Sequence, residues 1–228
     1  EAVAMADRLG DAEALCTCVK LSIMALRAHP HTLRKRLALG SEYIAAARRS
    51  GDDEGLADAY SWQLLHLLED AKPADLERVL EDYRRMSLGR FGIHQYYIRC
   101  AEVTLALLRG EWQTVEQDIE ALLATGSKTR RADAEGVYSA QMFALNRDLG
   151  RLRQLAPSVQ RFVRNSTTNA WIPGLMLTCI ELGMIDDARR FFERLAQEGF
   201  AAIPRHDMIV TCLVDCTETS APLGIAER

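Results

Sequence analysis

The sequence predicts an all-α fold, an α-α superhelix (solenoid) of about five stacked helical hairpins. Turn signals recur at Ala28, Ala71, Gly110, Gly150 and Gly183, with gaps of about 43, 39, 40 and 33 residues, which is the range of helical-hairpin repeats. Apolar residues recur at fixed distances on both sides of these turns. No stretch alternates between apolar and polar residues over the length of a strand, so we expect no sheet.

The spacing of the apolar residues indicates two helices for each turn. Of the positions seven and four residues before each turn, and five and nine after it, only Asn146 is polar; in the first hairpin they are Leu21, Met24, Leu33 and Leu37. Residues three or four apart share one face of a helix, so each helix carries one apolar stripe. One hairpin cannot bury both of its stripes, and neighbouring hairpins must therefore stack around a continuous core.

Two nearly identical segments, ADRLGD and ARRSGD, indicate where helices end and begin. Gly10 and Gly51 have the position of left-handed C-caps, because glycine takes a positive φ without strain. Asp11 and Asp52 follow them and are expected to cap the next helix with a side-chain oxygen. Each segment therefore ends the second helix of one unit and starts the following unit.

Prolines agree with this division, since Pro30 and Pro73 stand at or just before helix starts, where a missing N–H is harmless. Helices are expected near 12–27, 32–49, 54–70, 74–88, 93–109, 112–125, 132–149, 152–165, 169–182, 185–197 and 206–218. They pair into hairpins over about 12–49, 54–88, 93–125, 132–165 and 169–197, with a partial unit at 206–228. We expect a single solenoid domain over 1–228 that is a fragment of a larger multidomain protein.

Composition and charge exclude several classes of function. The net charge of -4 and the pI of about 5.8 give no basic footprint, so neither nucleic acid nor a membrane surface is expected as a direct partner. No run of 18 apolar residues and no signal peptide occur, which predicts a cytoplasmic protein. The cysteines lie within helical patterns, which favours reduced, buried thiols over disulfides. They are Cys16, Cys18, Cys100, Cys179, Cys212 and Cys216.

No motif predicts catalysis or a cofactor. The segment ATGSKT at 124–129 lacks the glycine spacing of a phosphate-binding loop, so we expect an exposed loop between hairpins. Cys212 and Cys216 lie four residues apart with His206 upstream, but no fourth metal ligand is evident and buried thiols are preferred. We expect exposed or singly hydrogen-bonded histidines throughout, and no metal site. The histidines are His29, His31, His66, His94 and His206.

Two segments, RGEWQTVEQDIEALL and LGMIDDARRFFERLA, resemble the tetratricopeptide repeat. That motif has a glycine at the turn, a small residue five positions later and a large one nine positions later, as in Gly183, Ala188 and Phe192. The other units depart from it, because larger residues replace the small one. These replacements are Leu76, Val115 and Leu155.

Over almost its whole length the chain is similar to the divergent helical-repeat region of large bacterial signalling ATPases. The likeness rests on EAVAMADRLGD, RLALGSEYIAAARRSGD, WQLLHLLED, ALLRGEWQTVEQDIEALL, VYSAQMFALNRDLGRL and ELGMIDDARRFFERLA. In that group an AAA-type or STAND nucleotide-binding module precedes the repeats, often with an adenylate/guanylate cyclase domain before it, and in some members a LuxR-type DNA-binding domain follows. The resemblance implies that catalysis and DNA binding lie outside this fragment.

The resemblance also implies a concave surface lined by the first helix of each hairpin. The residues expected there, among them Asp58, Ser61, Cys100 and Thr104, are mostly small and apolar. They lack the Lys/Asn set of carboxylate-clamp repeats, which favours binding of a helix over a peptide terminus. The alternative is that missing repeats cover this surface. Several aromatic and polar residues and one leucine near this groove are the candidates for partner or effector binding. They are Tyr60, Leu65, Tyr97, Arg99, Tyr138, Gln141, Arg147 and Trp171, with Tyr96 beside them.

Arg99 and Glu102 occupy positions that should pack against the second helix of the third hairpin. Either they form an ion pair between units, or the apolar stripe rotates onto other positions. Those positions are Tyr97, Ala101, Leu105 and Leu108.

These observations predict a non-catalytic protein-interaction and regulatory scaffold, and the resemblance implies that it is part of a bacterial signalling or transcription-regulating ATPase. Its expected partners are neighbouring domains of the same polypeptide or a second protein. The alternative is a superhelix that senses a small-molecule effector, as in maltose-regulator-like transcription regulators, and a further alternative is the regulatory region of a multidomain cyclase. Fold analogy carries these expectations, since helical arrays host many roles.

Overall fold

The computed structural model describes residues 1–27, 29–87, 92–128, 134–157, 172–203 and 209–225. All regular elements in these ranges are helices and none is a strand, so the predicted all-α class is confirmed. Among the described helices, none combines the length and the apolar character needed to span a membrane.

The chain divides into two compact units, Glu1–Met142 and Phe143–Arg228. The single-domain organisation over 1–228 stays a prediction. The first unit contains α1 (Ala2–Leu9), α2 (Ala12–Leu26), the 3-10 turn η1 (Pro30–Thr32), α3 (Leu33–Ser50), α4 (Asp53–Glu69), α5 (Pro73–Ser87), α6 (Gly92–Arg109), α7 (Trp112–Lys128) and most of α8 (Ala134–Asp148). The second unit contains η2 (Leu152–Leu155), α10 (Ile172–Glu181), α11 (Ile185–Gln197) and α12 (Ile209–Ser220).

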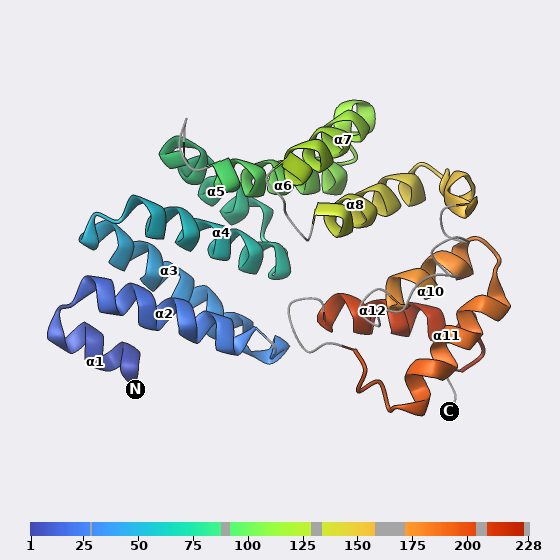
Figure 1. Cartoon of the computed structure of the whole chain (residues 1–228), viewed down its shortest axis with the longest axis horizontal. Helices are drawn as coiled ribbons and strands as arrows, with labels where there is room; N and C mark the ends of the chain where they lie inside the picture. The colour runs from blue at the N-terminus through green and yellow to red at the C-terminus, as the bar shows by residue number, and fades with distance from the viewer. Residues whose placement is uncertain (28, 88–91, 129–133, 158–171, 204–208, 226–228) are drawn as a thin grey trace. The chain divides into compact units, whose positions relative to one another are not determined.

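Helices of the first unit pack in the order of the sequence, from α1 against α2 through to α6 against α7 (Figure 1). α4 also contacts α6, so the first helix of one hairpin touches the first helix of the next. In the second unit α10 packs against both α11 and α12. This sequential pairing is that of an α-α helical-repeat superhelix.

The predicted caps are confirmed. Gly10 and Gly51 both have φ 69°, in the left-handed region. The Asp11 side chain accepts a hydrogen bond from the Ala14 amide at 2.9 Å, and Asp52 accepts one from the Gly55 amide at 2.8 Å. Each segment ends one helix and caps the next, as the repetition indicates.

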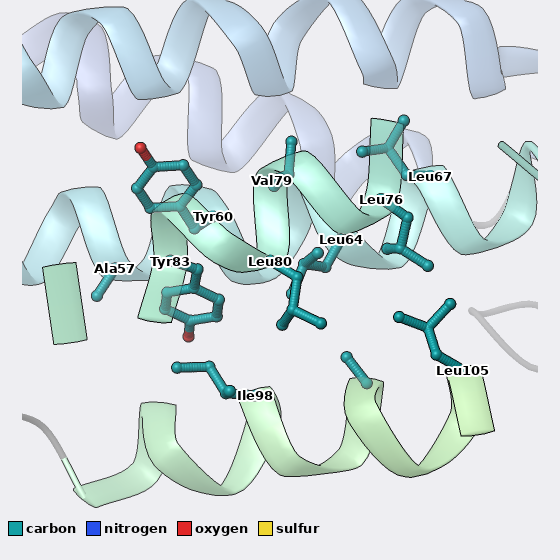
Figure 2. Close-up of a cluster of buried hydrophobic side chains, with 11 residues drawn as sticks. Ala57, Tyr60, Leu64, Leu67, Leu76, Val79, Leu80, Tyr83, Ile98 and Leu105 are labelled. Carbon is teal, nitrogen blue, oxygen red and sulfur yellow. The ribbon is translucent and has the colours of Figure 1, made fainter. Parts of the chain in front are cut away.

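The second and third hairpins share one apolar core, shown in Figure 2. Leu64 and Leu67 of α4 and Leu76 and Leu80 of α5 are buried at the positions that the turn spacing predicts. Ile98 of α6 joins the same cluster, so the core continues from one hairpin into the next.

The register predicted for α2 is wrong. Leu21 is 59% exposed and Met24 is 46% exposed, whereas Val19 and Ile23 are fully buried. α2 packs against both α1 and α3, and these contacts determine which side is buried. Because one residue turns a helix by roughly 100°, a displacement of one or two positions moves a side chain from core to solvent.

The expectation of an exposed loop at ATGSKT is wrong for residues 124–128, because α7 continues through Lys128. Thr129 lies outside the described residues. Gly126 is buried, and a Cβ atom there would lie 2.5 Å from the Cβ of Ala134 and 3.1 Å from the Tyr96 ring. The glycine therefore allows α7 to lie close to the start of α8. Tertiary contact overrides the local turn signal at this point.

A buried polar layer lies between α3 and α4. Arg36 is 3% exposed and forms two hydrogen bonds with Glu69, Nη1 to Oε2 at 2.8 Å and Nη2 to Oε1 at 2.7 Å. Its Nε also donates to Thr32 Oγ1 at 3.3 Å. The bidentate geometry compensates for taking the guanidinium out of water.

His66 belongs to this layer, and the expectation of exposed or singly bonded histidines is wrong for it. Its ring is fully buried, and among the described residues neither nitrogen has a hydrogen-bond partner. Burial, together with the charge of Arg36, lowers its pKa to about 4. His94 is buried and hydrogen-bonds Tyr83, His29 and His31 are exposed, and His206 lies outside the described residues.

The cysteines are free thiols. Burial is confirmed for Cys16, Cys179, Cys212 and Cys216, while Cys18 and Cys100 are only partly buried. Loss of hydration raises the pKa of both Cys179 and Cys216 to about 11, so these thiols are protonated at neutral pH.

Candidate partner-binding face

The first helices of the first two hairpins present apolar side chains to solvent. Leu21 and Met24 of α2 are exposed, as is Leu65 of α4, which is 40% exposed. We call these three residues and the helix surface that carries them the α2–α4 face. Large apolar side chains exposed together are characteristic of surfaces that bind other molecules.

Two polar contacts hold α2 beside α4. The Lys20 ammonium lies 2.9 Å from Asp58 Oδ2, and the Arg27 guanidinium lies 4.7 Å from the centroid of the Trp62 ring. Arg27 is the C-cap residue of α2 and follows Lys20 by about two turns, so the helices are joined at two levels. The exposed apolar residues therefore occupy a defined surface rather than two independent helices.

Asp58 extends this contact to a third helix. The Tyr43 hydroxyl of α3 donates a hydrogen bond to Asp58 Oδ2 at 3.0 Å. Burial, with the negative charge of Asp58, raises the pKa of Tyr43, so the hydroxyl keeps its proton and remains a donor. One carboxylate thus connects α2, α3 and α4.

Glu102 forms the ion pair between hairpins that the sequence left open as one alternative, whereas the ion pairs of Arg99 lie within its own hairpin. Arg99 lies 2.8 Å from Glu102 and 2.7 Å from Asp118 of α7. Glu102 also lies 2.7 Å from Arg84 of α5, in the preceding hairpin. The four charges join α5, α6 and α7.

The other alternative, a rotated stripe on α6, holds only in its middle. Ala101 and Leu105 are buried, together with Ile98. Tyr97 is partly buried, and Leu108 is 74% exposed, so the predicted burial of Leu108 is wrong. The stripe ends before the last turn of α6, which extends beyond the shared core.

Tyr60 does not line an open surface, because it is only 3% exposed. Its ring stacks on Tyr83 with centroids 5.7 Å apart, inside the core of the second hairpin (Figure 2). Its hydroxyl accepts a hydrogen bond from Arg48 Nη2 at 2.5 Å. Tyr60 lies in the middle of α4, between the expected groove positions Asp58 and Ser61, on the side that packs against α5.

Gln141 is likewise buried rather than lining a groove. Its Nε2 lies 3.4 Å from both the Cys100 carbonyl and Thr104 Oγ1, so the amide bridges α8 to α6. Cys100 and Thr104 are positions at which the sequence predicts an open groove. Gln141 of α8 contacts both residues, so α8 covers this part of the predicted groove on α6.

The remaining candidates are not brought together. Tyr97 and Tyr138 are partly buried in the first unit, and Tyr97 makes edge contacts with His94 and Tyr96. Arg147 belongs to the second unit, where it lies 2.9 Å from Glu181 and 3.4 Å from Glu218. Trp171 lies outside the described residues.

Sequence reasoning missed Lys20, Arg27 and Trp62, which join the two helices of this face. Trp62 lies four residues after Asp58, and this helical spacing was the available signal. Leu21 and Met24 were assigned to the core because their register was counted from the turn at Ala28.

The α2–α4 face combines exposed apolar side chains with two polar contacts. Lys20 pairs with Asp58, and the Arg27 guanidinium lies over the Trp62 ring. No group of three or more metal-ligating side chains converges within the described residues. Comparison with protein-family models, with curated proteins and with solved structures finds no match to this chain.

Proposed function

We propose that this chain is a non-catalytic protein-interaction scaffold whose α2–α4 face binds an amphipathic helix. The observation that carries the proposal is the exposure of Leu21, Met24 and Leu65 on two helices held beside each other. A helix with apolar residues at i, i+3, i+4 and i+7 recognises such a surface. The helix comes from a neighbouring domain of the same polypeptide or from a second protein.

The wider setting follows from the resemblance of the repeat motifs. We place the scaffold in a bacterial signalling or transcription-regulating ATPase, where it relays or restrains the activity of attached domains. The regulatory region of a cyclase would use the same binding mode. The effector-sensing alternative loses support at the predicted groove, since Tyr60 and Gln141 are buried and hydrogen-bonded.

The proposal predicts that charges placed on the α2–α4 face abolish partner capture. A Leu21→Asp/Leu65→Asp double variant puts two carboxylates where an apolar helix would pack, and their desolvation is unfavourable. Co-purification of partners with the chain, compared between wild type and variant, measures the effect. Leu108→Asp is the matched control, because Leu108 is exposed on α6 outside this face.

We expect the double variant to lose a partner that the wild type and Leu108→Asp both retain, with equal helical circular dichroism in all three. Retention of every partner by the double variant would contradict the proposed face. Turnover of a substrate by the purified chain would contradict the non-catalytic role.

A further inference from the structure

A hollow of about 340 Å³ lies on another part of the first unit. Residues of α3, α4, α5 and the α4–α5 turn line it. Leu37, Leu67 and Val79 supply apolar wall to it. Its other lining residues are mainly polar or charged, in contrast to the α2–α4 face. The hollow therefore calls for a ligand with both an apolar part and a charged part.

Three cations from successive segments line this hollow: Arg34 of α3, Lys72 of the α4–α5 turn and Arg78 of α5. Two carboxylates, Asp70 and Asp75, also line it, so three positive and two negative charges leave a net charge of +1. The excess favours an anion over a cation.

Both carboxylates are already engaged. Asp70 Oδ2 lies 2.7 Å from the Lys72 ammonium, and Asp75 Oδ1 lies 3.0 Å from Arg78 Nη2. The hydrogen bond from Lys72 lowers the pKa of Asp70, which stays ionised at neutral pH. Within the described residues each pair uses one carboxylate oxygen, and N–H donors of the arginines stay available for a ligand.

Of the three cations, Arg34 makes the weakest contact with a carboxylate. Its Nη1 lies 3.8 Å from Asp70 Oδ2, which is beyond hydrogen-bond distance, and its side chain is 78% exposed. A guanidinium carries five N–H donors in a planar fork that fits carboxylate and phosphate oxygens. Arg78 gives only Nη2 to Asp75, so it too retains donors.

The amide of Gln63 also lines the hollow. Gln63 is 7% exposed, and its Nε2 lies 3.5 Å from the exposed Ser41 hydroxyl at the limit of a hydrogen bond. A Cβ atom at Gly40 would lie 2.0 Å from Gln63 Oε1, so only glycine lets the amide lie there. Among the described residues Gln63 Oε1 has no hydrogen-bond partner. The hollow therefore offers polar groups beside the apolar wall.

We propose that this hollow binds a small organic anion, a carboxylate or phosphate group on a short apolar body. Arg34 and Arg78 hold the anionic oxygens, and Lys72 adds positive charge at the rim. Leu37, Leu67 and Val79 contact the apolar body. The site is separate from the α2–α4 face, so it adds a ligand to the chain without depending on the proposed scaffold role.

Calorimetric titration of the full chain tests the proposal, with butyrate, monobutyl phosphate and inorganic phosphate as probes and butylamine as the cation control. Low ionic strength is used, because salt screens exposed charges. We expect saturable one-to-one binding of butyrate or monobutyl phosphate, and the tighter of the two identifies the head group. If inorganic phosphate binds as tightly as monobutyl phosphate, the apolar residues do not contribute to binding. If butylamine binds as tightly as the anions, the hollow is not an anion site.

Variants locate the binding. Arg34→Ala and Arg78→Ala each remove charge-assisted hydrogen bonds and should weaken binding about tenfold. Ala38→Phe should abolish it by filling the hollow, since Ala38 lines it, without changing a charge. Arg85→Ala on α5 is the matched control, because Arg85 is exposed and pairs with Glu81 away from the hollow. No saturable binding of any anion, or equal binding by all variants, would overturn the proposal.

Discussion

Single residues that are buried and polar distinguish this solenoid from a purely apolar stack. Arg36 and Glu69 form a bidentate pair, and His66 lies beside them without hydrogen bonds among the described residues. A buried neutral imidazole is tolerated, whereas a buried imidazolium beside a guanidinium would be strongly unfavourable. The pH dependence of stability should therefore report on this layer.

We predict that His66 makes the first unit less stable as pH falls from about 6.5 to about 4. Its pKa is about 4 in the folded chain and ordinarily 6.5, so the unfolded chain binds more protons between these values. The stability that depends on neutral His66 is fully present above pH 6.5. About 3 kcal/mol of unfolding free energy is lost when the pH falls to 4. Denaturant unfolding of wild type and His66→Leu across this range measures it.

The difference between the two proteins isolates His66 from other titrating groups. His94, whose pKa burial also lowers, contributes with the same sign in both, and Asp215, whose pKa burial raises to about 6, contributes with the opposite sign in both. We expect the unfolding free energy of His66→Leu to vary less steeply with pH. Identical slopes would mean that folding does not lower the pKa of His66.

The buried state of these residues was not predictable from sequence spacing alone. His66 lies on α4 between Leu64 and Leu67, and its burial depends on where α3 crosses α4. The turn spacing predicts the apolar stripe because burial of each of its apolar side chains is favourable, so the same residue type recurs at every turn. A single polar residue carries no such repeated signal.

At the scale of elements, the capping motifs were the most reliable guide. Gly51 and Asp52 act through local backbone geometry, so the sequence suffices to place them. The registers of α2 and α7 were not predictable in this way. α2 is fixed by contacts on two sides, and the end of α7 is fixed by its approach to α8.

We predict that Gly126→Ala destabilises the first unit by about 1–3 kcal/mol, although alanine is the better helix former. The added methyl group would lie 2.5 Å from the Ala134 Cβ, so α7 and α8 must separate. Thermal or denaturant unfolding measures the loss. Gly92→Ala is the control, because a Cβ there has no neighbour within 4 Å and should leave stability unchanged or raise it.

Stabilisation by Gly126→Ala would show that the two helices do not approach in solution. The comparison with Gly92 separates packing from helix propensity, since both glycines lie in helices. The same reasoning explains why a Gly-Ser pair that looks like a loop lies within a helix. The small size of Gly126 permits close contact between α7 and α8 and does not form a turn.

For the molecule as a whole, the repeat period predicted the architecture much better than the binding residues. Every hairpin must bury its stripes against the next, so the period has one physical consequence wherever it occurs. The outward-facing residues have no such constraint, and of the candidate binding residues within the described ranges only Leu65 lies on the α2–α4 face. The hollow between α3 and α5 was missed because its charges come from three separate segments.

The central claim is that successive hairpins of the first unit share one core. Hydrogen–deuterium exchange of Leu80→Ala tests it most directly, because Leu80 of α5 belongs to the cluster that α4, α5 and α6 build (Figure 2). We expect a loss of about 2–5 kcal/mol of stability and faster amide exchange in α4, α5 and the neighbouring α6, with no change for the exposed Leu108→Ala. Faster exchange confined to α4 and α5, with α6 fully protected, would contradict a shared core.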